Sequence, residues 1–328
     1  MDDIRIYDTN FNLLHIENKI ISSNWSVHFN HIGKFEIHIL AETQAAEIII
    51  NNLDYTKNKI LVITQGDLQG IVTGIRMSED FTIYGKTCNW LLSRKVVPKF
   101  KSTDYFKVCN PEELARKLVL NAFTEQENFI LGEKVGLKNI ENFWRNTYNP
   151  LSDVVQDILS TLNAGHNVVF DTVNKKWIFN IASAEYPEII LSEANGNAFN
   201  TEYTYDLNNY YSACWYEQEQ DFVEGEFPEP IWTKLIKDEK TGIFSSECVV
   251  QATIESEAKS MLDLKNIKTE IVADVCGLNL GEDYKIGDIL RVQFFKGDIF
   301  RTELKQISGL NLGWEDGNET KQVVLKNI

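Results

Sequence analysis

"KILVITQGDLQGIVTGI", residues 59–75, is a run of β-forming residues, then Gly-Asp, then a second run of β-forming residues. The pattern predicts two strands joined by a tight turn at Gln65-Gly66-Asp67, because glycine readily takes the positive φ that two-residue hairpin turns need. A second copy, "DILRVQFFKGDIFRTELKQI", occupies residues 288–307 and turns at Gly297-Asp298. Gly-Asp between two strands is common, so the flanking sequence has to decide whether a larger unit is repeated.

The sequence around the two hairpins is β-rich in both places. Residues 1–97 contain short alternating runs such as "NWSVHFNHIGKFEIHIL" (24–40) and two short helical stretches, one near residues 43–54 and one within residues 81–97. Residues 186–328 are again rich in alternating β-forming residues, with a helical stretch from about Ser256. Two β-rich units of similar size that carry the same hairpin indicate an internal duplication.

The stretch between them, residues 98–185, has a different pattern. "NPEELARKLVLNAFT" (110–124) and "NPLSDVVQDILSTLNAG" (149–165) predict two helices, each starting at Asn-Pro, and we expect the second to stop at Gly165. "HNVVFDTVNKKWIFNI" (166–181) predicts a hairpin that turns at Asn174-Lys175. The expected fold is α+β and mainly β: β-barrel or sandwich domains at 1–97 and 186–328 flank an inserted α+β domain.

Charge is distributed unevenly along the chain. The formal net charge is −16, and residues 186–328 hold 26 Asp and Glu against 13 Lys and Arg. The peak is "EQEQDFVEGEFPEP" (217–230), which has six carboxylates and no basic residue. This stretch is either a solvated loop or a surface that repels phosphate or docks a basic partner. Tight binding to the outside of a nucleic acid is disfavoured, since that affinity comes from Lys and Arg.

No motif marks a catalytic, cofactor or metal site. Five cysteines lack a CxxC pair, and we expect free thiols. His28, His31 and His38 invite a metal interpretation, but they flank a turn and alternate in direction along strands. His166 with Asp153 or Asp157 has no Gly-x-Ser-x-Gly nucleophile beside it. The start of the chain has no secretion signal, and no apolar run approaches the ~20 residues that span a bilayer, so we expect synthesis in a cytoplasm and no membrane contact.

Two alternatives to a purely structural protein stay open. An unmarked pair of acids in the middle region, such as Glu112, Glu113, Asp153 and Asp157, could hydrolyse cell-wall polysaccharide. A row of aromatic residues could stack on glycans, although at strand spacing it more often packs a sheet. Its members are Tyr203, Tyr205, Tyr210, Tyr211, Trp215 and Tyr216.

Five stretches in order resemble one protein family across essentially the whole chain. They are "IRIYDTNFNLL", "NWSVHFNHIGKFEIHI", "IYGKTCNWLLSRKVV", "EYTYDLNNYYSACW" and "YKIGDILRV". The sequence resembles the Gp37-like tail proteins of bacteriophages and prophages from Gram-positive hosts, which are similar to baseplate-hub or tail-tip proteins. The resemblance implies two tail-tube-like domains, no enzymatic activity and no cofactor or metal. It also implies a homotrimer with a pseudo-six-fold ring, placed between the tail tube above and the spike or tip below.

This resemblance gives the unusual sequence features an expected role. DNA would slide through the lumen of the ring without specific binding, and part of the acidic excess would face that lumen. The protein would be assembled in the host cytoplasm and reside in the tail of a virion or tail-like particle. The residues expected on assembly surfaces are Gly66, Asp67, Gly297, Asp298, Glu217, Glu219, Asp221, Glu224 and Glu226.

Overall fold

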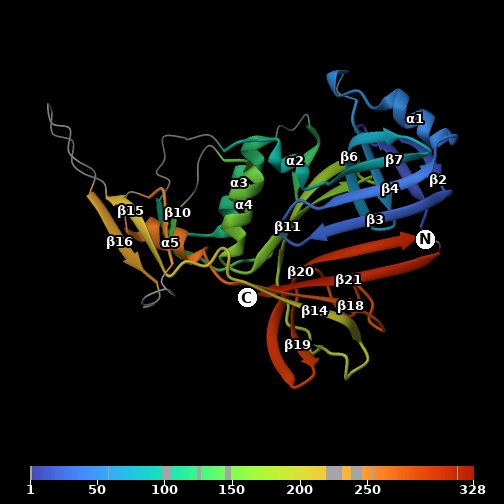
Figure 1. Cartoon of the computed structure of the whole chain (residues 1–328). Helices are drawn as coiled ribbons and strands as arrows, with labels where there is room; N and C mark the ends of the chain where they lie inside the picture. Colours follow the sequence, from blue (N-terminus) through green and yellow to red (C-terminus); the bar gives the residue numbers. More distant parts are fainter. Residues whose placement is uncertain are drawn as a thin grey trace, which may run out of the picture. The chain divides into compact units, whose positions relative to one another are not determined.

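The computed structural model of the chain describes residues 2–57, 59–97, 105–123, 127–144, 149–218, 231–237, 246–252, 255–315 and 317–328. The fold is α+β and mainly β, as expected from the sequence (Figure 1). The chain forms two compact units, one made of Met1–Thr201 with Val272–Ile328 and the other of Glu202–Ile271. Within the described ranges, no helix combines the length and the apolar character needed to cross a membrane.

The expected three-part division does not coincide with these two units. The first unit contains residues from all three expected parts, so boundaries at 97/98 and 185/186 fall inside it. The three-domain description therefore stays a prediction about how the chain is built.

The same strand order occurs twice in the main sheet of the structure. The first set contains β3 (Ile20–His28), β4 (Lys34–Leu40), β5 (Leu61–Gln65), β6 (Leu68–Met77) and β7 (Asp80–Thr87). The second contains β14 (Ala198–Asp206), β18 (Lys268–Val275), β19 (Ile289–Lys296), β20 (Ile299–Glu315) and β21 (Asn318–Asn327). The sheet runs β3-β4-β7-β6-β5 in one set and β14-β18-β21-β20-β19 in the other, which is the same order of equivalent strands. This repetition supports the internal duplication.

Both Gly-Asp turns lie where the sequence places them. Gln65 pairs with Leu68 across the first turn, and Lys296 pairs with Ile299 across the second. Gly66 has a φ of 56° and Gly297 a φ of 60°. A positive φ at the first of two turn residues is the requirement that glycine meets most easily, so the two turns are equivalent in conformation as well as in position.

Strand β20 joins the two repeats in one hydrogen-bonded sheet. Its first half pairs with β19, from Ile299 to Gln306, and its second half pairs with β3, from Gly309 to Glu315. Strand β21 lies along the other side of β20. One long strand therefore completes its own repeat and also covers the edge strand of the first repeat.

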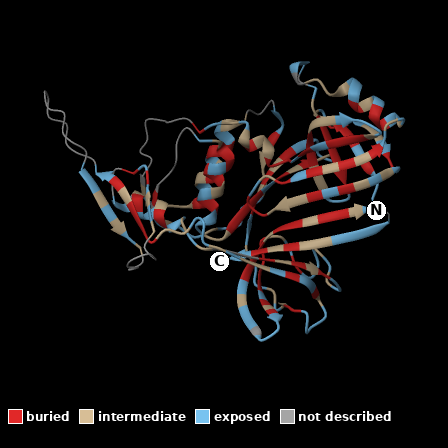
Figure 2. Cartoon of the chain, in the orientation of Figure 1, coloured by how far each residue is buried: buried red, intermediate tan, exposed pale blue. Residues whose placement is uncertain are grey.

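The sheet of the first repeat curls strongly. Trp25 on β3 donates from Nε1 to Gln65 Oε1 on β5 at 2.8 Å, although three strands separate β3 from β5 in the sheet. Buried and exposed residues alternate along these strands (Figure 2). Strands β1 (Ile4–Asp8) and β2 (Leu13–Glu17) and helix α1 (Gln44–Asn52) complete this part. The described strands do not close a barrel, because β14 and β2 stand at the two ends of the sheet order.

The middle of the chain is the expected α+β segment. Helix α2 (Trp90–Ser93) ends the preceding part of the chain. The elements of the middle segment are β8 (Tyr105–Cys109), α3 (Pro111–Ala122), β9 (Phe129–Leu131), β10 (Ile140–Trp144), α4 (Leu151–Ser160), β11 (Ala164–Asp171) and β12 (Lys176–Ser183). Asn110 caps α3 by accepting a hydrogen bond from the Glu113 N–H. Helix α4 ends at Ser160 rather than near Gly165, because Asn163 takes the left-handed conformation (φ 52°) and Gly165 already belongs to β11. Lys175, with a φ of 54°, forms the predicted β11–β12 turn.

The second unit is a small α+β assembly. Strand β15 (Ala213–Gln218) pairs antiparallel with β16 (Ile231–Ile236) and parallel with β17 (Glu247–Val249). Helix α5 (Glu255–Asp263) contributes Ala258 and Leu262 to a core that it shares with these strands. Tyr216 is buried in that core, whereas Tyr205 is half exposed. The aromatic row is therefore divided between a core and the surface and does not form one stacking platform. Strand β13 (Ile190–Leu191) belongs to the main sheet, where it pairs with β19.

Candidate assembly surfaces

The two Gly-Asp turns are exposed at the ends of equivalent hairpins. Asp67 is exposed, and a side chain added at Gly66 would meet the Asp2 carboxylate at 2.5 Å. Nothing lies within 4 Å of the position where a Cβ would stand on Gly297. The first turn is therefore backed by the start of the chain, while the second stands free. Their part in assembly remains a prediction.

The acidic stretch is only partly within the described residues. Glu217 is exposed near the end of β15. Glu219, Asp221, Glu224 and Glu226 lie outside the described residues.

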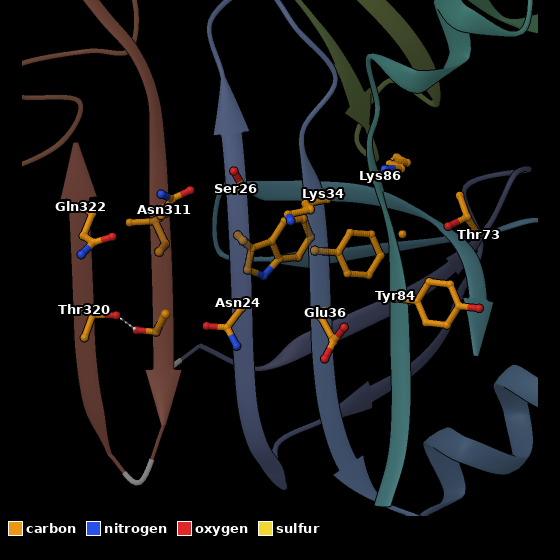
Figure 3. A pocket seen from close by; sticks show the side chains of 15 residues that line it. Asn24, Ser26, Lys34, Glu36, Thr73, Tyr84, Lys86, Asn311, Thr320 and Gln322 are labelled. Carbon is orange, nitrogen blue, oxygen red and sulfur yellow. Dashed lines mark hydrogen bonds between the residues drawn. The ribbon is translucent and has the colours of Figure 1, made fainter. Parts of the chain in front are cut away.

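A hollow of about 690 Å³ lies on the sheet where the two repeats join. Its lining comes from β3, β4, β6 and β7 of the first repeat and from β20 and β21 of the second. Figure 3 shows the polar side chains of this surface projecting from neighbouring strands. We call it the polar sheet face: Asn24, Ser26, Lys34, Glu36, Thr73, Tyr84, Lys86, Asn311, Thr320 and Gln322.

Two glycines allow the strands at this joint to approach closely. A Cβ on Gly309 would lie 2.8 Å from the Val27 carbonyl oxygen and 2.6 Å from His28 Nδ1. A Cβ on Gly313 would lie 2.6 Å from Thr320 Oγ1. Because real Cβ atoms do not approach backbone oxygen so closely, the contact between the repeats depends on the missing side chain at Gly309.

The polar sheet face carries mixed charge and few reactive groups. Lys34, Lys86 and Glu36 are its ionisable side chains apart from Tyr84. Glu36 Oε1 lies 2.9 Å from His38 Nε2 and 3.9 Å from the Arg76 guanidinium. Among the residues that the structure describes, no group of three His, Cys, Asp or Glu side chains is placed to hold a metal ion. The face therefore presents two cationic side chains and one anionic side chain beside neutral polar groups.

The amide side chains of the buried Asn89 and the half-buried Gln69 attach the middle segment to the first repeat. Asn89 Oδ1 accepts from the Val168 N–H at 2.8 Å, and its Nδ2 donates to the carbonyls of His31 (3.0 Å) and His166 (3.4 Å). Gln69 on β6 accepts from the Phe170 N–H at 2.7 Å and donates to the Phe170 carbonyl at 3.1 Å. These amides occupy the open edge of β11, where a further strand would otherwise pair.

Other amides extend this attachment. Asn30 donates to the Gln156 carbonyl and to Ser160 Oγ, each at 3.1 Å. Gln306 on β20 donates to the carbonyls of Asn163 (3.2 Å) and Gly287 (3.1 Å). Both repeats therefore hold the middle segment through directed hydrogen bonds. No spacing pattern in the sequence distinguishes these amides from surface amides, so their positions were not predicted.

The sequence of the chain also matches a known family. A family model described as siphovirus ReqiPepy6 Gp37-like protein matches residues 3–224. The chain belongs to this family of phage tail proteins. The resemblance drawn from the five sequence stretches is confirmed, and the coarse location in a phage tail follows from the family. No curated protein matches the sequence.

Solved structures share the fold of this Gp37-like protein at low sequence identity. The 43 kDa tail protein of prophage MuSo2 from Shewanella oneidensis matches with a TM-score of 0.60 and 11% identity, over 99% of this chain and 98% of that one. Prophage tail protein gp18 from Listeria monocytogenes EGD-e matches with a TM-score of 0.53 and 14% identity, over 99% and 94%. The half-lidded Francisella PdpA–VgrG complex matches with a TM-score of 0.50 and 11% identity, over 99% of this chain and 57% of that chain.

The histidines considered from the sequence of this Gp37-like protein do not form one cluster. His28 and His31 have ring centroids 6.4 Å apart, while His38 lies on β4 and contacts Glu36 of the same strand. Burial lowers the pKa of His31, as do the nearby His28 and Lys326, against an opposing effect of Asp153.

His166 is buried between the middle segment and the first repeat. Its Nδ1 lies 2.7 Å from Asn30 Oδ1, and its buried Nε2 has no hydrogen-bond partner. Burial, with a smaller effect of His31, lowers the pKa of His166 to about 3. Asp153 accepts from Ser152 Oγ at 2.9 Å. The His166–Asp153 pair suggested by the sequence is therefore replaced by an amide contact, which fits a structural role for the imidazole.

The acids of the middle segment serve local structure. Glu112 is 2% exposed, and its carboxylate accepts from the N–H groups of Val135, Gly136 and Leu137 at 2.7, 2.7 and 3.1 Å. Desolvation raises the pKa of Glu112, but the three backbone N–H groups and Arg116 outweigh it and leave the pKa below its usual value. Glu113 forms an ion pair with Lys134. The Glu112 carboxylate fixes a loop in this way, and its lowered pKa is the opposite of the raised pKa of a general acid.

Proposed function

We propose that this tail protein is a non-enzymatic hub at the tip or baseplate of the tail, where three copies form a pseudo-six-fold ring between the tail tube and the spike or tip. One observation carries the proposal: equivalent strands occur twice in the same order, and the repeats join through β3 and β20. Three chains with two such repeats present six similar units. A closed ring of this kind matches a six-fold tube on one side and a three-fold spike on the other.

The surroundings of the ionisable groups support a role without catalysis. Glu112 and Glu113, two of the four acids suggested for a hydrolase, are bound to backbone N–H groups and to a lysine, respectively. The aromatic row that would bind glycans is divided between a core and the surface.

Passage of DNA through the ring is part of the same proposal. The polar sheet face holds two lysines and one glutamate, so it does not supply a field that repels phosphate. An acidic lining would have to come from other surfaces of residues 186–328, where the acids outnumber the basic residues.

The mass of the purified protein tests the ring. Light scattering after size exclusion should give about three times the chain mass of 37.7 kDa, with the trimer fraction rising with concentration. A stable dimer would contradict the proposal, because two-fold symmetry does not fit a tail axis. Cell-wall hydrolysis by the pure protein that is lost in Glu112→Ala and Asp153→Ala variants would favour a hydrolase.

A further inference from the structure

We propose that neighbouring copies of the chain join edge to edge, with β14 of one copy pairing antiparallel with the end of β6 in the next copy. The inference rests on the trimeric ring proposed above and names the surfaces that close it. The partner is a second copy of this chain.

The joint between the two repeats provides the template. Within the chain, β3 of the first repeat pairs with β20 of the second, from Gly309 with His28 to Glu315 with Ser22. In the matching strand orders, β14 is the equivalent of β3 and β6 is the equivalent of β20. If every junction in a six-unit ring is alike, the three junctions between chains pair β14 with β6.

Both strands have an open edge in the described part of the chain. Strand β14 stands at one end of the sheet order. Strand β5 covers β6 only from Leu68 to Ile71, and no described strand continues along that side of β6 up to Met77. The equivalent edge of β20 lies beyond the residues that pair with β19, and β3 pairs with it there.

The composition of these edges fits a partner. Proteins protect a free edge strand with lysine, proline or a short length. β14 has nine residues with neither lysine nor proline, and its Phe199 and Tyr205 are 45% and 54% exposed. On β6, Met77 is 62% exposed. A long edge strand that exposes aromatic side chains is explained if another copy covers it.

Irregularities in the strands set the register. A bulge at Thr73 precedes Gly74 in β6, and a bulge at Ser308 precedes Gly309 in β20. Gly74 is therefore the equivalent of Gly309, and Ile75 is the equivalent of Leu310.

Strands β3 and β14 align by length and burial. Each has nine residues, and end-to-end alignment makes the buried Thr201 of β14 the equivalent of the buried Ser23 of β3. End-to-end alignment makes Tyr205 the equivalent of Val27, which pairs with Leu310. Ile75 of one copy should then face Tyr205 of the next, and Arg76 should face Thr204.

Disulfide cross-linking tests this register. Opposed residues of antiparallel strands have Cα atoms about 4.5–5.5 Å apart, which lies within the range that a disulfide can bridge. The exposed Cys276 is first replaced by serine to remove background reaction. Ile75→Cys/Tyr205→Cys is then oxidised and run on a non-reducing gel, with Arg76→Cys/Thr204→Cys as a second pair. We expect covalent dimers and trimers in at least one pair and no larger species.

Control variants distinguish pairing at this edge from non-specific cross-linking. Each single variant should stay uncross-linked, because the two strands of the joint differ. Ile16→Cys/Tyr205→Cys moves one cysteine to β2, the opposite end of the sheet, and should also stay uncross-linked. Circular dichroism and thermal melting show which variants are folded.

The outcomes distinguish the edge from the ring. A trimer by light scattering without cross-linking in either folded pair overturns the β14–β6 joint and leaves the ring. Cross-linked trimers from a protein that scatters as a monomer support the joint as a weak contact. A monomer that does not cross-link overturns both.

Discussion

The attachment of β11 to the first repeat should depend strongly on Asn89. This side chain is 4% exposed and satisfies the Val168 N–H and the carbonyls of His31 and His166. Asn89→Leu keeps the shape but leaves those three backbone groups without partners. An unsatisfied buried group costs about 1–3 kcal/mol, and the 3.4 Å contact counts least, so we expect a loss of about 3–5 kcal/mol.

Urea unfolding followed by tryptophan fluorescence measures this loss, and hydrogen exchange of the Val168 amide locates it. Asn167→Leu is the matched control, since Asn167 is exposed on the same strand. It should change the free energy of unfolding by less than about 0.5 kcal/mol. A loss below about 1 kcal/mol in Asn89→Leu, with unchanged exchange at Val168, would refute the reasoning.

Three further predictions follow from individual side chains. The pKa of His166 is about 3 in the folded state, so its imidazole is neutral there, whereas the unfolded chain binds a proton at this residue below the usual pKa of 6.5. The free energy of unfolding should therefore fall by about 1.4 kcal/mol per pH unit as the pH is lowered from 6.5 towards 3. Urea titrations at several pH values should show this slope, and the His166→Gln variant should lose it. Gly309→Ala should destabilise the β3–β20 joint by at least about 2 kcal/mol, because the added methyl group would contact the Val27 carbonyl. Gly297→Ala in an open turn should cost only about 1 kcal/mol. Thermal melts of the two variants measure this difference in stability. Glu112→Gln replaces one carboxylate oxygen by an NH2 group, which cannot accept a hydrogen bond from the backbone N–H that faces it. This variant should lose about 1–2 kcal/mol of stability at pH 7, and the difference from the parent should shrink as acid protonates Glu112; equal stabilities at pH 7 would contradict this.

Local structure could be predicted from the sequence because short patterns determine it. Glycine in the Gly-Asp turns and Asn110 before Pro111 act on their immediate neighbours, and both appear in the structure as expected. The predicted end of α4 at Gly165 was wrong, because Asn163 takes the left-handed conformation that follows the helix. A glycine was therefore not needed to end the helix.

The long-range contacts could not be predicted in the same way. No spacing in the sequence indicates that β20 pairs with β19 over one half and with β3 over the other. The second unit separates β14 from its neighbour β18, so the equivalent of the short β3–β4 connection is hidden by an insertion. Asn89 and Gln69 were missed because a buried amide that completes a strand edge has the same sequence signature as a solvated one.

The repeated strand order also gives a reason why three copies would complete the proposed ring. Each repeat offers one edge of the β3 type and one of the β20 type, and a single chain satisfies one pair internally through Gly309 to Glu315. One edge of each type is left, on β14 and on the end of β6. Such unlike edges form a head-to-tail contact, which either closes a ring or continues as a filament. If the angle at the internal joint is the angle between copies, the number of repeats in a closed ring follows from that angle, and six repeats require three chains. The cross-linked species that stop at three would measure this closure directly.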